Sequence, residues 1–210
     1  MANAPPKAPP DAPPALILAS KSAARATLLY NAGIHFDIDP ASLDEAAIRR
    51  MVQAESGAAT LAAATLAEAK AMAVSQRHED ALVIGADQIL ECDNVWFDKP
   101  GDMDQARADL LALRGLTHQQ HSAVSVARGG ALLWHHVETA HLTMRDFSDD
   151  FLDDHLAAAG TAVLASAGAY QLEGLGVGLF SRIEGDYFSI LGLPLLPLLD
   201  FLRQQGVVGS

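Results

Sequence analysis

The chain has 210 residues, half of them hydrophobic and 19% charged, with a formal net charge of −12. This length suits one globular domain or two small lobes that share a core. The acidic balance argues against an extended surface for a DNA or RNA polymer, which needs a basic stripe, but it permits a nucleotide ligand, because a small phosphate site needs only a few local cations and a metal. No stretch approaches about 18 uninterrupted apolar residues, so no transmembrane helix is expected.

The ends and the cysteine content indicate the compartment. Residues 1–14 are rich in Ala and Pro and lack the apolar core of a signal peptide, so we expect a disordered tail ahead of one folded domain over residues 15–208. The single cysteine, Cys92, excludes an intramolecular disulfide and fits a reducing compartment. We therefore expect a cytoplasmic protein, with Cys92 as a half-buried strand residue.

The first predicted elements are a buried strand at Ala15–Ala19 and a helix of about 10 residues that begins near Ser22 and ends before Gly33. Ser20 and Ser22 lie at the junction of this strand and helix. The unpaired backbone N–H groups of a first helical turn attract anions, so the junction is a candidate phosphate site. Helix capping by Ser22 explains the same residue equally well.

The alanine-rich segment Ala58–Arg77 predicts a helix, and Ala81–Gly85 predicts a strand that ends at Ala86-Asp87-Gln88. Asp87 is then expected just past the carboxyl end of a buried strand, where open α/β sheets place ligand groups. A carboxylate there could hold a metal or take a proton from water. The alternative is an aspartate that merely turns the chain after a strand.

The remaining elements alternate irregularly, which predicts an α/β protein with a mixed sheet. We expect a helix from the capping box at Asp102 to Gly115, strands at 117–127 and 131–143 around a hairpin turn at Arg128-Gly-Gly130, a helix from Ser148 to Ala159, strands at Gly178–Arg182 and Phe188–Leu191, and a last helix from Pro194 to about Gln205.

Three further charged positions are candidates, although each is ordinary when taken alone. Asp44-Glu45 precedes a helical stretch, where carboxylates are favoured anyway. Lys70 lies on the alanine-rich helix and would usually be solvated. Lys99 precedes Pro100, which restricts the lysine backbone to an extended conformation and holds its amine in one direction.

Several common motifs are absent from the sequence. Gly174-Leu-Gly-Val-Gly178 lacks the spacing of a dinucleotide fingerprint, and no P-loop or G-x-S-x-G elbow is present. His135 and His136 are adjacent on a predicted strand and would point to opposite faces, so they cannot bind zinc together.

The ordered set of these segments resembles the Maf family of nucleoside triphosphate pyrophosphatases. The segments that carry the resemblance are Leu16-Ile-Leu-Ala-Ser-Lys-Ser22 with Arg25, Ser42-Leu-Asp-Glu45, Lys70, Ile84-Gly-Ala-Asp87, Asp98-Lys-Pro100, Leu113-Arg-Gly-Leu-Thr-His118, Ala167-Gly-Ala-Tyr170, Glu173-Gly174, Ile183-Glu-Gly-Asp-Tyr187 and Gly192-Leu-Pro194. No one of them is decisive, but their shared order is hard to produce by chance.

This resemblance implies a two-lobed mixed sheet with a central cleft, related to the inosine-triphosphate pyrophosphatase architecture, and often a homodimer. It implies hydrolysis of a nucleoside triphosphate to the monophosphate and pyrophosphate with Mg²⁺ or Mn²⁺. Asp87 would be the general base and Glu45 the second carboxylate near the metal, so that both are metal ligands. The residues implied to hold the triphosphate are Ser20, Ser22, Arg25, Lys70 and Lys99.

The sequence departs from the family pattern at five positions, which concern the substrate rather than the reaction. Ala23 and Ala24 replace a proline and an arginine, and Ser166 replaces a lysine. Gln88 and Glu173 replace a threonine and a glutamine, and both resemble the 7-methylguanosine-triphosphate branch of the family. We therefore expect both to bind the substrate and to favour guanine-type bases. The alternative is that Glu173 points to solvent or to Arg182 and contacts no base.

Two other functions remain open at this point. One is a non-catalytic, nucleotide-binding regulator of cell division. The other is a housekeeping hydrolase of a different phosphorylated metabolite.

Overall fold

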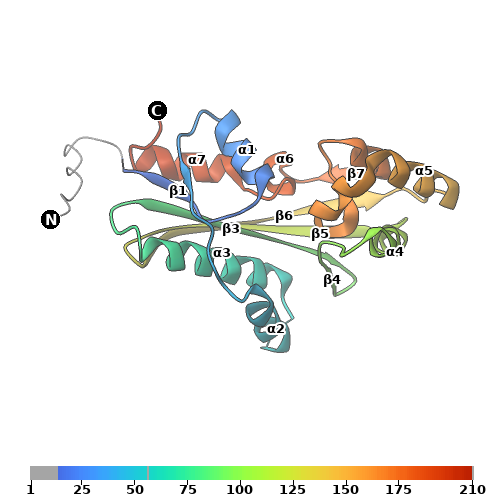
Figure 1. Ribbon diagram of the computed structural model, residues 1–210, viewed down its shortest axis with the longest axis horizontal. Coiled ribbons are helices and arrows are strands. Elements are labelled where there is room, and N and C mark those ends of the chain that lie inside the picture. The colour runs from blue at the N-terminus through green and yellow to red at the C-terminus, as the bar shows by residue number, and fades with distance from the viewer. Residues whose placement is uncertain (1–13, 56, 210) are drawn as a thin grey trace.

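The fold is mixed α/β, as the sequence predicts, with seven strands in one sheet and seven α-helices among the described residues (Figure 1). A computed structural model describes residues 14–55 and 57–209. The strands are β1 (Leu16–Leu18), β2 (Asp37–Ile38), β3 (Leu82–Cys92), β4 (Val95–Phe97), β5 (Thr117–Arg128), β6 (Ala131–Met144) and β7 (Phe180–Glu184). The helices are α1 (Ala23–Asn31), α2 (Glu45–Glu55), α3 (Ala59–Ser75), α4 (Met103–Leu113), α5 (Asp149–Ala159), α6 (Tyr187–Ile190) and α7 (Leu195–Gln204), with 3₁₀ turns η1 (Gly160–Ala165), η2 (Ala167–Ala169) and η3 (Leu175–Leu179).

The strand order is β2-β1-β3-β5-β6-β7, with β4 beside β3. β1 runs parallel to β2 and β3, and all other pairs are antiparallel. The predicted hairpin between β5 and β6 is confirmed. Its turn uses Gly129 and Gly130 at φ 54° and 80°, a conformation that two-residue hairpins require and glycine adopts without strain.

One edge of β3 is covered only at its two ends. On the opposite edge β5 pairs with Val83–Glu91, while on this edge β1 pairs with Leu82–Ile84 and β4 pairs with Leu90–Cys92. Among the described residues, the segment between these two pairings, residues 85–89, therefore has no neighbouring strand on that side. The gap lies at the middle of the sheet and opens next to Asp87 and Gln88.

Helix α3 packs unusually close to β3 at this gap. A Cβ on Gly85 would lie 2.1 Å from the backbone oxygen of Ala67 and 2.5 Å from the backbone nitrogen of Ala71, so only glycine fits there. The small side chains of α3 allow the same approach, because its buried face is mostly alanine. This close packing brings Lys70 of α3 beside the strand.

Two hydrophobic cores lie on one face of the shared sheet, which agrees with the predicted two-lobed form. One core joins α1 and α7 to the first half of β3, and the other joins α4 and α5 to its second half. Figure 1 shows α1, α6 and α7 over one end of the sheet, α5 over the other end, and α2 and α3 on the opposite face.

Three sequence predictions about this region need correction. Asp87 lies inside β3 rather than past its end, because β5 continues to pair with this strand as far as Glu91. Phe188–Leu191 forms helix α6 and the turn after it, not a strand, since Asp186 caps the helix by accepting a bond from the backbone N–H of Ser189 at 2.7 Å. The neighbouring strand begins at Phe180 and not at Gly178.

The expected tail at residues 1–14 falls almost entirely outside the described residues, which begin at Pro14. Cys92 is the last residue of β3 and is fully rather than half buried. In the part of the chain that the structure describes, no helix is long and apolar enough to cross a membrane.

Candidate active site

A cleft of about 640 Å³ opens at the uncovered edge of β3. All nine residues that the sequence analysis selected line it: Ser20, Ser22, Arg25, Glu45, Lys70, Asp87, Gln88, Lys99 and Glu173. They come from six separate segments of the chain, and the fold brings them together at one place.

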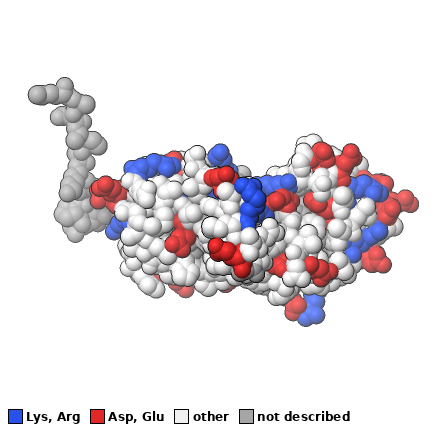
Figure 2. All heavy atoms as spheres, turned by 90° about the horizontal axis from the view of Figure 1, so that it is seen from below, with Lys and Arg blue, Asp and Glu red and all other residues white. Residues whose placement is uncertain are grey.

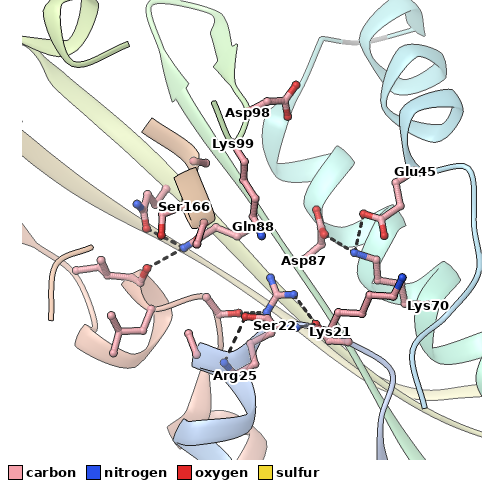
Figure 3. Close-up of a pocket in the computed structure, with 18 of the residues that line it drawn as sticks. Lys21, Ser22, Arg25, Glu45, Lys70, Asp87, Gln88, Asp98, Lys99 and Ser166 are labelled. Atoms are coloured by element: carbon pink, nitrogen blue, oxygen red, sulfur yellow. Dashed lines mark hydrogen bonds and ion pairs between the residues drawn. The ribbon is translucent and has the colours of Figure 1, made fainter. Parts of the chain in front are cut away.

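Two carboxylates and a buried lysine form the centre of the cleft. Lys70 Nζ donates to Asp87 Oδ1 at 2.6 Å and contacts Glu45 Oε2 at 2.9 Å (Figure 3). The side chain of Lys70 is only 8% exposed, so this lysine is not the solvated residue that an alanine-rich helix usually carries. Glu45 is the first residue of α2, and its carboxylate faces Asp87 across the ammonium group.

Arg25 is the second buried cation. Its Nε donates to the backbone oxygen of Gly192 at 2.7 Å and its Nη1 to Ser20 Oγ at 3.0 Å. Burial lowers the pKa of Arg25, while the charges of Asp87 and Glu45 oppose that shift. The two hydrogen bonds hold the guanidinium rigidly beside the carboxylates.

The serines at the start of α1 perform the local role expected of them. Ser22 is the N-cap of α1, because its side chain accepts from the backbone N–H of Arg25 at 3.4 Å, and Ser20 Oγ accepts from the N–H of Ser22 at 3.3 Å. Capping does not remove the junction from the site, since both serines line the cleft.

Lys99 enters the cleft from the loop after β4 and is exposed. Figure 3 shows its side chain extending into the cleft toward Gln88 and Asp87. The residue before it, Asp98, forms an ion pair with Arg49 of α2, one helical turn beyond Glu45. This pair ties the loop that carries Lys99 to the helix that carries Glu45.

Gln88 and Glu173 also line the cleft. Strand alternation places the side chain of Gln88 on the opposite face from Asp87; its Nε2 lies 3.0 Å from the backbone oxygen of Ile190. Glu173 is exposed in the turn before η3 and does not pair with Arg182, whose partner is Glu184 at 2.7 Å.

Sequence reasoning missed several residues that line the cleft, notably Lys21, Arg49, Gln120 and Tyr170. Lys21 had a visible signal, because it stands between the two serines of the predicted anion site. Gln120 had none, since a glutamine in a strand carries no pattern that marks it as part of a site.

The cleft is locally basic in an acidic protein. Five basic and four acidic side chains line it, although the chain as a whole carries −12. Figure 2 shows Lys and Arg side chains gathered near the middle of one face of the molecule, with acidic side chains next to them. Such a cleft suits a small polyanion.

Comparison with known proteins agrees with this geometry. A family model described as "Maf-like protein" matches residues 15–205. The chain belongs to the Maf family. The match runs through every segment that lines the cleft, from the strand before Ser20 to the loop after α6 at Gly192.

Curated Maf relatives are similar over nearly their whole length. A nucleoside triphosphate pyrophosphatase of Paramagnetospirillum magneticum is 58% identical over 190 residues, which cover 90% of this chain and 98% of that protein. One of Rhodospirillum rubrum is 53% identical over 94% of this chain and 98% of its own. A 7-methyl-GTP pyrophosphatase of Rhizobium meliloti is 48% identical over 94% of this chain and 99% of its own.

The Maf cleft has the donor chemistry for a divalent cation. Glu45 and Asp87 face one another across a single nitrogen atom, so their oxygens lie close enough to share an ion. Within residues 14–55 and 57–209, no cluster of three or more His, Cys, Asp or Glu side chains forms a complete metal site. Two carboxylates with further ligands from phosphate and water are the usual set for Mg²⁺.

Proposed function

We propose that this protein hydrolyses nucleoside triphosphates to the monophosphate and pyrophosphate. The observation that carries the proposal is the convergence of Asp87, Glu45 and Lys70 at one point of a basic cleft. The names of the relatives support the same reaction class.

In the proposed reaction, the oxygen of a water molecule attacks the α-phosphorus and the bond from that phosphorus to the bridging oxygen breaks. Asp87 accepts the proton of the water on its carboxylate. Asp87 is suited to this role because its backbone lies within β3 and Lys70 Nζ donates to its Oδ1 at 2.6 Å. A divalent cation held by Glu45 and Asp87 would supply Lewis-acid stabilisation of the phosphate oxygens.

The cations of the cleft balance the charge that develops on the leaving pyrophosphate. Arg25 is held rigidly by Gly192 and Ser20, whereas Lys99 is exposed and free to follow the substrate. Preorganised donors of this kind stabilise a transition state more than flexible ones, because they need no rearrangement as the charge develops. Ser20 and Ser22 would contact the same phosphates from the start of α1.

We also propose a preference for guanine-type bases, including 7-methylguanine. Glu173 offers a carboxylate and Gln88 an amide to a ligand in the cleft. A carboxylate can accept both N–H groups of the guanine edge, whereas uracil and thymine offer one N–H between two acceptors. Ala24 provides no aromatic surface for a cationic base, so the preference is broad.

The expected setting is the cytoplasm, where free nucleotides are the substrate and no membrane or nucleic-acid polymer takes part. The homodimer implied by the family resemblance belongs to the same proposal, and light scattering on the purified protein measures it.

A pyrophosphate-release assay over GTP, 7-methyl-GTP, UTP and dTTP, with and without Mg²⁺, tests the proposal. We expect pyrophosphate and monophosphate in equal amounts, and only with the metal. Release of inorganic phosphate alone would contradict the α–β cleavage. Nucleotide binding without any turnover would favour the non-catalytic regulator instead.

A further inference from the structure

The side-chain amide of Gln88 is held in one orientation by the groups around its nitrogen. Four acceptors lie within hydrogen-bond distance of Nε2: Gln120 Oε1 at 2.7 Å, Ser122 Oγ at 2.9 Å, the Ile190 oxygen at 3.0 Å and the Ser189 oxygen at 3.2 Å. A backbone carbonyl can only accept, so a reversed amide would place Oε1 against two carbonyl oxygens.

The other two neighbours also act as acceptors toward Gln88. Ser122 has a single hydroxyl hydrogen and donates it to the backbone oxygen of Ser189 at 2.6 Å. Its oxygen is therefore left to accept from Gln88. The amide of Gln120 is oriented with its Nε2 toward the hydroxyl of Tyr170, so its Oε1 faces Gln88.

A buried chain of hydrogen bonds continues behind Gln120. Its Nε2 donates to the hydroxyl of Tyr170 at 2.6 Å, and that hydroxyl lies 2.7 Å from Nε2 of His118. The hydroxyl hydrogen has one acceptor here, Nε2 of His118, so we assign the tautomer of His118 with the proton on Nδ1. Burial lowers the pKa of His118 to about 4, which keeps the ring neutral and Nε2 free to accept.

The opposite atom of the Gln88 amide faces the cleft. Oε1 lies 3.6 Å from the point that a Cβ of Gly192 would occupy, and Gly192 lines the cleft beside Arg25. Among the described residues no side chain or backbone group donates to this oxygen, and it is not among the fully buried atoms. A ligand base that displaces water from this oxygen loses a hydrogen bond unless it presents a donor to it.

We propose that Gln120, supported by Tyr170 and His118, is a positioning residue that fixes the Gln88 carbonyl oxygen as an obligate hydrogen-bond acceptor toward the substrate base. The proposal rests on the proposed function and deepens it, because it selects the N1–H and 2-amino edge of a guanine-type base. Gln120 acts through Gln88 and need not touch the base itself.

The test compares the binding of three non-hydrolysable α,β-imido triphosphates: the guanosine compound, the inosine compound without the 2-amino group, and the O6-methylguanosine compound without the N1 hydrogen. Calorimetry gives Kd for each. We expect the wild-type protein to bind the guanosine compound about threefold to tenfold more tightly than at least one of the other two, the range that one net hydrogen bond provides.

Gln120→Met should lower this binding ratio but not to one, because Ser189, Ile190 and Glu173 remain. Tyr170→Phe should lower the ratio by a smaller factor, because Gln120 still contacts Gln88. Tyr170→Phe keeps the ring and is the safeguard if Gln120→Met does not fold. The matched control is Gln119→Met, the same substitution on the same strand, at a half-buried position that does not line the cleft. It should keep the wild-type ratio.

If Gln120 had only a structural role, Gln120→Met would weaken the binding of all three ligands by the same factor, and that result would overturn the proposal. A binding ratio of one in the wild-type protein would overturn it as well. Pyrophosphate release is measured in parallel. Discrimination in binding without any turnover would refute the proposed reaction and leave this inference standing, whereas turnover without discrimination would do the reverse. The absence of measurable nucleotide binding overturns both.

Discussion

Asp87 shows at the residue scale how position turns an ordinary side chain into a reactive one. The carboxylate is 12% exposed and is held by Lys70 at 2.6 Å. Its place in the middle of β3 fixes the backbone on both sides. A base held in this way can meet a water molecule that a bound triphosphate positions.

Asp87→Asn should therefore lower kcat by about two orders of magnitude or more, the loss typical of a removed general base. The amide is nearly isosteric, so the melting temperature should stay close to that of the wild type. Pyrophosphate release measures the first and calorimetry the second. Asp109→Asn is the matched control, because Asp109 is a buried carboxylate on α4 whose partner is Gln105 at 2.7 Å and which does not line the cleft. Wild-type turnover by a folded Asp87→Asn protein would refute the assignment.

His118 makes the stability of the protein depend on pH. Its pKa is about 4 in the folded protein against 6.5 for a free histidine, because burial disfavours the charged ring. Between these values the unfolded chain binds a proton that the folded protein does not, so stability is full above pH 6.5 and falls as the pH falls toward 4. This one group should remove about 2 kcal/mol between pH 7.5 and 5.

Urea unfolding at the two pH values measures this difference. His121 and His155 are also buried with lowered pKa values and act in the same direction. The relevant comparison is therefore with His118→Gln, which should lose less stability than the wild type over the same interval. An identical loss of stability in both proteins would show that His118 is not responsible for the pH dependence.

At the scale of elements, α2 and the loop after β4 face one another across the cleft. Arg49 of α2 pairs with Asp98 of the loop, and its guanidinium lies 5.9 Å from the centre of the Trp96 ring. Asp98 is 71% exposed, and exposed ion pairs add little to stability. The Arg49–Asp98 ion pair should instead fix the relative positions of Glu45 and Lys99, because it joins α2, which carries Glu45, to the loop that carries Lys99.

We expect Arg49→Ala to lower kcat/KM by about tenfold, since small misplacements of groups around a reacting centre are costly, while the melting temperature changes little. Steady-state kinetics and thermal unfolding measure the two effects. Arg50→Ala removes the same charge from the next position of α2, which is exposed and does not line the cleft, and should leave kcat/KM near wild type. Equal effects of the two variants would mean that only the net charge matters.

In the whole molecule, one face of the sheet packs against two cores. β3 contributes Leu82 and Ile84 to the core under α1 and α7, and Leu90 to the core beside α4 and α5. β6 likewise packs Trp134 against the first core and Leu142 within the second. Because β3 and β6 contribute side chains to both cores, unfolding of one core would also disrupt the other.

The protein should therefore unfold in a single transition despite its two lobes. Differential scanning calorimetry measures this through the ratio of calorimetric to van't Hoff enthalpy, which should be near one. Two resolved transitions, or a ratio well above one, would show that the lobes unfold independently.

Much of the local structure is determined by the sequence itself. The caps at Ser22, Asp102 and Ser148 each form the side-chain to backbone bond that their residue types predict. The Gly129-Gly130 turn follows from backbone conformations that glycine adopts without strain. These features depend on neighbours within a few residues, which is why sequence patterns identify them.

The positions of the active-site groups depend on packing between distant parts of the chain. The length of β3 depends on pairing with β5, so the sequence placed Asp87 beyond the strand rather than inside it. Phe188–Leu191 is apolar enough for a strand, but the cap at Asp186 and contacts to distant strands favour a helix there. The carbonyl oxygens of Ser189 and Ile190 in this helix accept from Gln88. The burial of Lys70 between Glu45 and Asp87 requires three distant segments to meet at an edge of β3 that none of the described strands covers. Such meetings depend on packing between elements, which no local pattern records.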